Sequence, residues 1–413
     1  MKELCLLPAL FICRSIAAGA QLDVNPHTGL QHIISQAKPF DTILVHEGVY
    51  REGGITIDKP LVLIGDARPV IDGEHKYQPI SIRSSHVYMS GFRIVHCGIT
   101  SLDDIAGIKV YNAREVYVSD NILDDNYFGI YLSNCVCCYV SGNYMTAHSS
   151  VEHNSGNGVH AWKCDSLVIQ NNNMQGHRDG IYLEFATNSY IAYNHCEKNI
   201  RYGLHFMFSH NNTYAHNSFI NNGAGVAVMY TRNVTMVHNV FAENRGGASY
   251  ALLLKDIQSS YMADNIFRQN TIGIFMEGCT RSLLERNEFR QNGWAIKVQA
   301  SCENNQFRHN NFFANTFDIS TNNQLVFNVF DSNYWDKYEG YDLDRDRAGD
   351  VPYHPVSLFA MVSDQMPYAM LFWRSFTVLL LDRAEKVIPS LSPDRLRDNS
   401  PLMKPYDSVR SGQ

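Results

Sequence analysis

The chain has 413 residues, of which 45% are hydrophobic and 18% are charged, so it has enough apolar side chains for a packed core and is not intrinsically disordered. Its formal net charge is −7. This charge argues against nucleic acid as a partner, because nucleic-acid binding needs a basic surface.

Residues 1–20 have the pattern of a secretory signal peptide. Lys2 precedes a short apolar stretch from Leu4 to Cys13, and Ala18-Gly19-Ala20 supplies small residues before Gln21. The stretch is too short to span a bilayer. We predict that this segment is removed on export, the alternative being an apolar segment that caps the fold.

The residues that follow predict an N-terminal cap and the first strands. Residues 30–37 predict a short helix, and residues 42–45, 55–57 and 61–64 predict strands, with Pro60 at a corner between two of them.

A unit of about 22 residues then recurs, and each unit begins with a small residue followed by an aliphatic one. Successive starts are 22, 29, 22, 23, 22, 26, 22 and 22 residues apart. The starts are Gly107, Gly129, Gly158, Gly180, Gly203, Gly225, Ala251, Gly273 and Ala295. The two longer intervals place extra residues near 147–157 and 244–250, where we expect outward loops.

Asparagine recurs with the same period. The series is Asn121, Asn143, Asn172, Asn194, Asn217, Asn239, Asn265, Asn287, Asn310 and Asn328. Asparagine tolerates left-handed backbone, and its side chain can form hydrogen bonds along a stack of chains. We therefore interpret these residues as structural corners.

Short alternating strands, such as 203–208 and 213–216, separate these corners without helical periodicity. Such strands can pair only with the equivalent strand of the next unit, giving parallel sheets with strands about 4.8 Å apart. We therefore predict an all-β, right-handed parallel β-helix over residues 21–335. An acidic turn region at 336–362 and an apolar C-terminal tail at 363–413 would follow it.

Eight cysteines remain after the signal segment, and none has the spacing of a zinc site. Cys135, Cys164 and Cys279 all lie six residues after the start of a unit. Such equivalent positions favour buried free thiols over ligands or disulfides.

Strand alternation assigns the first and third residues after each starting glycine to the core, and the second and fourth to solvent. This alternation predicts an outer column of Glu184, Met207 and Met229 in adjacent coils, with His205 two residues from Met207 on the same face. Thioether and imidazole groups both suit copper, and thioethers select Cu(I).

His177 and Asp179, in the corner just before Gly180, and His210, just after the strand, are secondary candidates for metal ligands. The residues alone leave two interpretations open. One is a copper-holding surface, and the other is an adaptable apolar patch that docks another protein.

Several segments along the chain carry a family pattern. They are 180–185 (GIYLEF), 201–211 (RYGLHFMFSHN), 228–230 (VMY), 252–256 (LLLKD) and 333–336 (NYWD). These segments resemble the NosD family, the periplasmic accessory proteins of nitrous oxide reductase. The motif carries over to His205, Met207 and His210, with Glu184 and Met229 from the adjoining coils.

This resemblance implies a non-enzymatic role in the periplasm. NosD proteins work with an ABC-type permease and its ATPase, which implies an association with the inner membrane. They receive copper from a small chaperone lipoprotein and help to assemble the copper-sulfur cluster of nitrous oxide reductase. The resemblance therefore implies copper, as transient Cu(I), and these three kinds of protein partner.

Asp342, Asp344, Asp346 and Asp350 alternate as in a loop that binds a cation through oxygen ligands. Related proteins usually carry glycine where Arg347 stands. Calcium binding and a solvated charged turn are the two interpretations of this segment.

Residues 366–381 are apolar and aromatic but too short to span a membrane comfortably. We expect an amphipathic segment that lies against a permease or membrane surface, or that packs against the last coil.

The main alternative function is that of a polysaccharide lyase or epimerase, because such enzymes commonly use a parallel β-helix. Their chemistry needs a base and a basic groove that neutralises the sugar carboxylate. The outer columns contain Lys109, Lys255 and Lys297 several coils apart. The sequence therefore predicts no clustered set of Arg, Lys and Asp residues in these columns, and it favours a protein that is not an enzyme.

Overall fold

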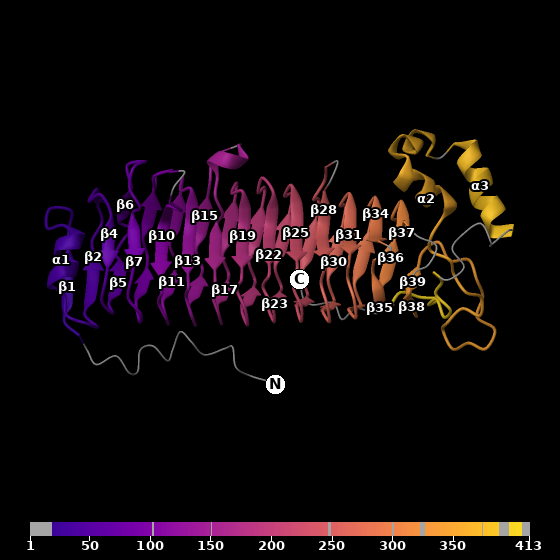
Figure 1. Cartoon of the computed structure of the whole chain (residues 1–413), viewed down its shortest axis with the longest axis horizontal. Helices are drawn as coiled ribbons and strands as arrows, with labels where there is room; N and C mark the ends of the chain where they lie inside the picture. The colour runs from indigo at the N-terminus through magenta and orange to yellow at the C-terminus, as the bar shows by residue number, and fades with distance from the viewer. Residues whose placement is uncertain are drawn as a thin grey trace. The chain divides into compact units, whose positions relative to one another are not determined.

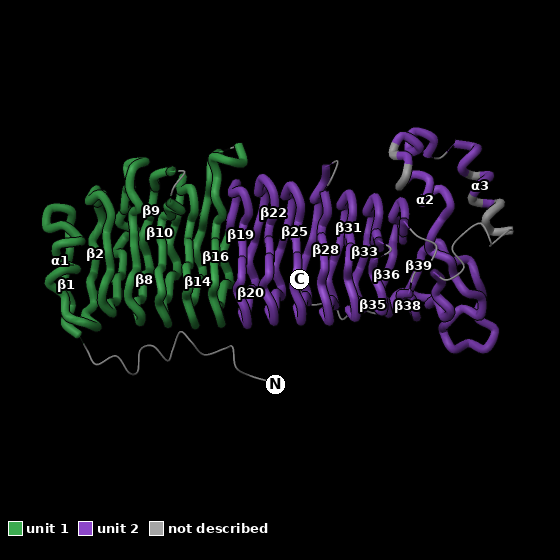
Figure 2. Tube along the Cα trace, in the orientation of Figure 1, with its two compact units in different colours: residues 1–173 green, residues 174–413 purple. Residues whose placement is uncertain are grey.

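The computed structural model describes residues 19–100, 103–149, 151–246, 249–299, 301–322, 327–373, 375–387 and 396–406. The expected signal segment lies outside these residues except for Gly19 and Ala20. The chain divides into two compact units, residues 1–173 and 174–413 (Figure 2). Both are built from parallel β-coils (Figure 1), which confirms the predicted right-handed parallel β-helix.

In the first unit, equivalent strands of successive coils form three parallel sheets, named A, B and C. Sheet A contains β1 (Gln21–Val24), β2 (Thr42–Val45), β5 (Val62–Gly65), β8 (Tyr88–Ser90), β11 (Tyr117–Ser119), β14 (Tyr139–Ser141) and β17 (Val168–Gln170). Sheet B contains β3 (Val49–Tyr50), β6 (Val70–Asp72), β9 (Arg93–Val95), β12 (Ile122–Asp124) and β15 (Tyr144–Thr146). Sheet C contains β4 (Ile55–Ile57), β7 (Ile80–Ile82), β10 (Ala106–Tyr111), β13 (Phe128–Ser133) and β16 (Val159–Trp162).

Two helical segments complete the first unit. Helix α1 (Leu30–Gln36) buries Leu30 and Ile34 and packs against β1, β2 and β4, as expected of the predicted N-terminal helix. The long interval between coils contains the short 3₁₀ helix η2 (Glu152–Asn154). Strand β18 (Asn173–Gln175) begins at the boundary between the units.

The second unit repeats the same three sheets. Sheet A contains β20 (Tyr190–Ala192), β23 (Thr213–Ala215), β26 (Thr235–Val237), β29 (Tyr261–Ala263), β32 (Leu283–Glu285), β35 (Glu303–Arg308) and β38 (Phe327–Asp331). Sheet B contains β21 (His195–Glu197), β24 (Ser218–Ile220), β27 (Val240–Ala242), β30 (Ile266–Arg268), β33 (Glu288–Arg290), β36 (Asn311–Phe313) and β39 (Tyr334–Trp335). Sheet C contains β19 (Asp179–Glu184), β22 (Tyr202–Met207), β25 (Ala224–Met229), β28 (Tyr250–Lys255), β31 (Ile272–Glu277), β34 (Trp294–Val298) and β37 (Phe317–Thr321).

The core of the second unit contains a ladder of stacked rings. Phe241, Phe267, Phe289 and Phe312 are buried, and their ring centroids are 4.6, 4.9 and 4.9 Å apart from one coil to the next. Offset stacking is favourable at these separations and adds to the hydrophobic gain of burial. Identical side chains at equivalent positions therefore fill successive layers without a change of backbone shape.

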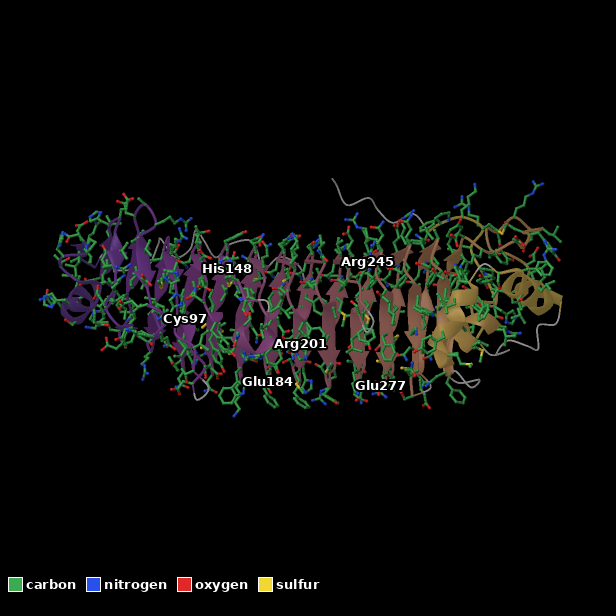
Figure 3. The ribbon with its side chains drawn as sticks, turned by 90° about the horizontal axis from the view of Figure 1, so that it is seen from above. Cys97, His148, Glu184, Arg201, Arg245 and Glu277 are labelled. Carbon is green, nitrogen blue, oxygen red and sulfur yellow. The ribbon has the colours of Figure 1, made fainter. Side chains whose placement is uncertain are left out.

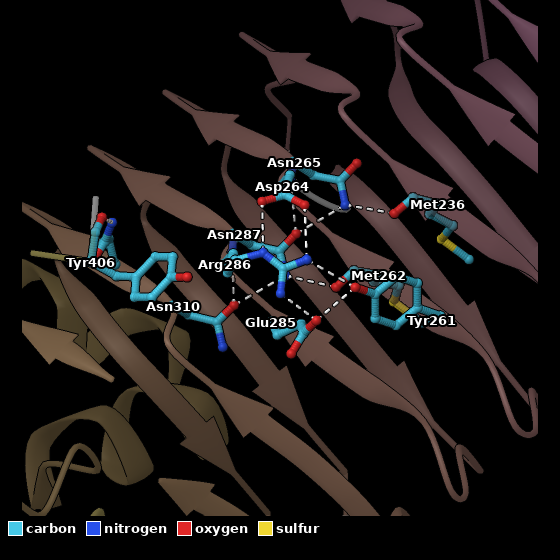
Figure 4. Close-up of polar contacts among 11 residues, drawn as sticks. Met236, Tyr261, Met262, Asp264, Asn265, Glu285, Arg286, Asn287, Asn310 and Tyr406 are labelled. Atoms are coloured by element: carbon cyan, nitrogen blue, oxygen red, sulfur yellow. Dashed lines mark hydrogen bonds and ion pairs between the residues drawn. The ribbon is translucent and has the colours of Figure 1, made fainter. Parts of the chain in front are cut away.

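The recurring asparagines form hydrogen-bonded ladders, as predicted, and Figure 4 shows one of them. The expectation of left-handed backbone at these asparagines is wrong, because the residue directly before them has the positive φ, as at Asp264 and Arg286. The Asn287 side-chain amide donates to the Met262 carbonyl and to Asn310 Oδ1, both at 3.0 Å. Its own Oδ1 accepts from the backbone N–H of Asn265 at 3.1 Å and from that residue's side-chain amide at 2.9 Å. Each rung therefore satisfies buried backbone groups at a corner that has no sheet partner.

The glycines that begin the repeat are required by the close approach of neighbouring coils. A Cβ atom at Gly180 would lie 2.5 Å from the Gly203 carbonyl oxygen, and one at Gly273 would lie 2.4 Å from the Ala295 carbonyl oxygen. Alanine, at Ala251 and Ala295, is the largest residue at these starts, and a larger side chain would force the strands apart, so the small residue that marks the repeat is a packing requirement.

The cysteines are structural, as predicted. All eight cysteines among the described residues are free, and seven of them are buried while Cys137 is partly exposed. Burial raises the pKa of the Cys97 thiol to about 12, so this side chain stays protonated at neutral pH.

The C-terminal region of the second unit has two parts. Helix α2 (Leu358–Gln365), the 3₁₀ helix η3 (Pro367–Phe372) and helix α3 (Phe376–Val387) follow the coils, and Phe359 and Trp373 pack against Phe317 of β37. Among the described residues, no helix is long and apolar enough to cross a membrane.

Residues 396–406 return to the coil and close the asparagine ladder. The buried Asp398 carboxylate accepts hydrogen bonds from the backbone N–H of Asn333 at 2.9 Å, from its side-chain amide at 3.0 Å and from Trp335 Nε1 at 3.1 Å. Asp398 thus takes the place of a further asparagine. Part of the predicted tail at 363–413 is therefore part of the β-helix.

We expect Asn287→Ala to lower the free energy of unfolding by about 1–3 kcal/mol, because the substitution leaves buried donors and acceptors without partners. Asn233→Gly is the control, since Asn233 forms an exposed hydrogen bond to Asn211 and glycine tolerates its positive φ of 55°; this variant should change stability by about 0.5 kcal/mol or less. Urea unfolding measures both variants. An equal loss in the two would show that the buried ladder has no special energetic role.

Candidate functional site

The predicted outer column lies on sheet C of the second unit. The register of β19 with β22 places Glu184 beside Met207, and that of β22 with β25 places Met207 beside Met229. All three side chains are partly exposed. The Tyr182 hydroxyl lies 3.6 Å from Met207 Sδ on the same face. The sequence therefore predicted the alignment of these three residues correctly.

The prediction that His205 faces solvent is wrong, because this side chain is only 7% exposed. Its ring lies against Tyr182 at a centroid distance of 4.7 Å and against Tyr202 at 5.0 Å. Ala227, which pairs with His205 in the next coil, is fully buried. Alternation assigned His205 to the outer surface, but the neighbouring rings of Tyr182 and Tyr202 cover its side chain.

A buried charged cluster holds His205 from the other side. Asp179 is completely buried, and its Oδ2 lies 3.7 Å from His205 Nδ1. Arg201 donates to both carboxylate oxygens of Asp179, from Nε at 2.9 Å and from Nη2 at 2.6 Å. Asp179 and Arg201 belong to neither outer column, so the cluster leaves unchanged the prediction that those columns lack a grouped set of Arg, Lys and Asp side chains.

The cluster also sets the protonation of Asp179. Burial alone would raise the pKa of this carboxyl, but the interactions with His205 and Arg201 outweigh burial and hold the pKa below its usual range. Asp179 is therefore an anion that neutralises Arg201 in the fold. The charges of Asp179 and Arg201 neutralise each other, so Arg201 adds no net positive charge to this face.

An exposed aromatic strip borders the column. Phe185, Phe208 and Tyr230 each follow a column residue and lie at the corner in left-handed backbone conformation. Their rings stack with centroid distances of 5.2 and 5.1 Å, and each side chain is at least 36% exposed. Sequence reasoning missed this strip, although the fifth residue after Gly180, Gly203 and Gly225 is aromatic each time.

The two secondary histidines occupy different environments. His177 is 1% exposed, and its backbone N–H donates to Asn199 Oδ1 at 3.1 Å, so it takes the position of an asparagine in an inner ladder. His177 is thus buried, unlike the partly exposed Met207 and Met229. His210 is partly exposed, and its Nδ1 lies 3.3 Å from Thr231 Oγ1. Burial, followed by the charge of Arg232, lowers the pKa of His210.

The acidic segment forms a tight loop. One oxygen each from Asp342, Asp344 and Asp346 lies within 4.8 Å of the other two, while Asp350 Oδ2 accepts the Leu343 N–H at 2.7 Å. Arg347 has φ of +79°, a left-handed conformation that explains a preference for glycine at its position. Asp342 and Asp346 accept hydrogen bonds from backbone N–H groups of the same loop, so calcium binding stays a prediction.

We expect Asp179→Asn to destabilise the protein by about 3 kcal/mol at pH 7, because the substitution leaves Arg201 and His205 without their anion. A carboxyl with a lowered folded-state pKa stabilises the fold above its unfolded-state pKa of about 4, and this stabilisation is lost as the pH falls through the folded-state pKa. The variant should therefore lose less stability than the parent chain below about pH 4.

Urea unfolding at pH 7 and at acidic pH measures this difference. Asp256→Asn is the control, because Asp256 is exposed at a corner of the same unit. If Asp179→Asn lost as much unfolding free energy at acidic pH as the parent chain, that result would contradict the assignment of a charged Asp179.

Comparisons with known proteins bear on the family. Residues 141–340 match the family model described as "Periplasmic copper-binding protein (NosD)". A relative from Stutzerimonas stutzeri, named "Probable ABC transporter binding protein NosD", is 24% identical over 401 residues, covering 86% of this chain and 85% of the relative. A protein of the same name from Pseudomonas aeruginosa is 27% identical over 401 residues, covering 85% of this chain and 86% of the relative.

Solved structures share the fold at low sequence identity. The catalytic unit of an α-1,3-glucanase from Streptomyces thermodiastaticus has a TM-score of 0.63 at 13% identity, covering 78% of this chain and 71% of that one. A mannuronic acid specific lyase from the human gut microbiota has a TM-score of 0.53 at 10% identity, covering 79% and 90%. These structures support a β-helix fold and nothing further, whereas the family model and the two named relatives show that the chain is similar to NosD proteins.

Proposed function

We propose that this chain is a periplasmic, non-enzymatic accessory protein that holds copper transiently and acts with an ABC transporter in assembling the copper-sulfur cluster of nitrous oxide reductase. The observation that carries the proposal is the outer column, in which the strand register brings Glu184, Met207 and Met229 together. The family description names a periplasmic copper-binding protein, and the relatives' names include an ABC transporter.

The donor set of the column suits monovalent copper. Two thioethers in adjacent strands select Cu(I) over harder cations, and the neighbouring carboxylate adds a negative charge that favours any cation. Partly exposed thioethers have little packing role, so their alignment over two coils favours binding over core filling. Copper is therefore the cargo that this face would accept.

His205 supplies a reason for transient binding. Its imidazole is covered by Tyr182 and Tyr202, so it can reach a copper ion beside Met207 only after a local rearrangement. A site that is complete only after such a change binds weakly at rest and more tightly when a partner docks. His210 is a further ligand candidate at the adjoining corner, whereas His177 would require a larger movement because it is buried.

The aromatic strip is the surface on which a copper donor or acceptor would dock. Stacked exposed rings beside a cargo site give a partner rigid apolar contact area at low entropic cost. The chaperone lipoprotein and nitrous oxide reductase are the partners that the similarity to NosD proteins implies for this face.

A second candidate function is carbohydrate chemistry. The cluster of Asp179, Arg201, His205 and nearby tyrosines contains residue types that lyases use as base and neutraliser. Arg201 is, however, engaged by both oxygens of Asp179 and is not available to neutralise a sugar carboxylate. This pairing favours the accessory function over an enzyme.

We expect Met207→Leu together with Met229→Leu to weaken Cu(I) binding by about tenfold or more, because leucine has a similar volume but no thioether. Competition with a chromogenic Cu(I) chelator on the mature chain measures the affinity. Met236→Leu with Met262→Leu is the matched control, since both residues are buried in the same unit, and this variant should bind copper like the parent chain.

Equal Cu(I) affinity in the outer and buried double variants would exclude this column as the site. Cleavage or epimerisation of a uronate polymer, lost in Arg201→Lys, would instead support the second candidate function.

An exposed apolar surface on the C-terminal helices is the proposed contact with the transporter. It contains Met366, Tyr368, Leu371, Phe372, Phe376 and Leu380, each more than half exposed. Val378 and Phe359, by contrast, pack in a buried cluster with Phe317. Both earlier interpretations of this segment therefore have support, since one part packs on the coil and the other part faces outward.

We expect Tyr368→Ser with Leu371→Ser to reduce co-purification with the permease by about tenfold or more, because a partner interface loses its apolar anchors. Substitutions are used in place of a deletion of the tail, because a deletion would also remove Asp398, which closes the coil. Leu343→Ser is the control, because Leu343 is equally exposed but lies in the acidic loop. Unchanged association of the tail variant would place the contact elsewhere.

A further inference from the structure

A second group of metal-ligating side chains lies in the first unit. His75, His96 and Asp125 each place one ligand atom within 4.8 Å of the other two. β9 and β12 pair with Val95 beside Asp124, so His96 and Asp125 follow at the same corner of adjacent coils. His75 comes from the turn after β6, where its backbone N–H donates to the His96 carbonyl at 2.8 Å. The centroids of the His75 and His96 rings are 4.5 Å apart.

A buried carboxylate orients His96. Asp72 is 9% exposed, and its Oδ1 lies 3.0 Å from His96 Nδ1. Asp72 is itself fixed by Arg51 Nε at 3.0 Å and by the Glu74 backbone N–H at 3.0 Å. A carboxylate on one ring nitrogen fixes the tautomer and leaves the other nitrogen, Nε2, as the metal ligand.

A cavity of about 40 Å³ adjoins the group, and its lining includes His75, Asp125, Cys97 and His148. Figure 3 labels Cys97 and His148. The Tyr127 backbone N–H donates to Cys97 Sγ at 2.9 Å, and the Cys97 thiol donates to the Gly98 carbonyl at 3.4 Å. His148 Nε2 lies 2.7 Å from Asp124 Oδ1. The cavity leaves room for a water molecule as a fourth ligand.

We propose that His75, His96 and Asp125 form a second metal site, which binds one divalent transition-metal cation of borderline softness such as Zn²⁺. Two imidazoles and one carboxylate with an open position are the ligands of many zinc sites. The group has neither thioether nor thiolate, so it prefers Zn²⁺ to Cu(I), opposite to the methionine column. The site lies outside residues 141–340 and does not depend on the proposed copper function.

The test is competition between the untagged mature chain and a chromogenic chelator for Zn²⁺, with excess Ca²⁺ present to occupy oxygen-ligand loops. One Zn²⁺ per chain is expected. Asp125→Asn and His96→Gln should each weaken that binding by about tenfold or more. Binding of Co²⁺ should give the visible absorption of a four-coordinate site in the parent chain and not in these variants. Zn²⁺ should also raise the thermal midpoint of the parent chain only.

His86→Gln is the matched control, because His86 is an exposed histidine of the same unit that pairs with Glu115 at 3.1 Å. It should bind Zn²⁺ like the parent chain, as should Met207→Leu with Met229→Leu. Circular dichroism and the metal-free thermal midpoint establish that each variant folds. Two results would overturn the proposal: an unchanged Zn²⁺ affinity in Asp125→Asn and His96→Gln, or an equal loss of affinity in His86→Gln. Neither result would affect the proposed copper function.

Discussion

The exchange of hydrogen bonds between coils is the interaction on which the rest of each unit depends. A β-helix corner turns away from the sheets, so its backbone N–H and C=O groups lack strand partners. The asparagine ladders supply those partners inside the fold, where leaving a donor or acceptor unpaired costs about 1–3 kcal/mol. The Asn287 side chain forms four hydrogen bonds between coils, of which two are to backbone groups and two are to the asparagine side chains above and below it. The register of successive coils is therefore fixed at the corners as well as along the strands.

A fixed register separates residues that maintain the fold from residues that are free to carry function. Phe289, Asn287 and Gly273 each occupy a position where the neighbouring coil allows little variation. Outward positions in the same coils face no such constraint. Side chains that are distant in sequence, such as Glu184, Met207 and Met229, can then be aligned along one face by choosing the residue at one position of each repeat.

The period of the sequence was sufficient to predict the fold class, the core positions and the alignment of the column. It was sufficient because hydrophobic alternation and corner residues repeat in every coil. It could not predict that Tyr182 and Tyr202 cover His205, since burial of an outward residue depends on the size of neighbours in three dimensions. The return of Asp398 to Asn333, 65 residues earlier, was also hidden, because a contact of that kind leaves no local pattern.

The same reasoning explains why the His75 group escaped sequence analysis. His96 and Asp125 are 29 residues apart in a part of the chain where the unit length varies, and His75 lies in a turn outside the repeat. Only the folded coil brings an oriented imidazole together with a second imidazole and a carboxylate, the last two of which line one cavity. Ligand softness then distinguishes the two proposed metal sites, since thioethers on one unit and imidazole with carboxylate on the other would select different ions. A stacked fold that keeps strand register can thus carry two ligand sets of different chemistry without altering its core.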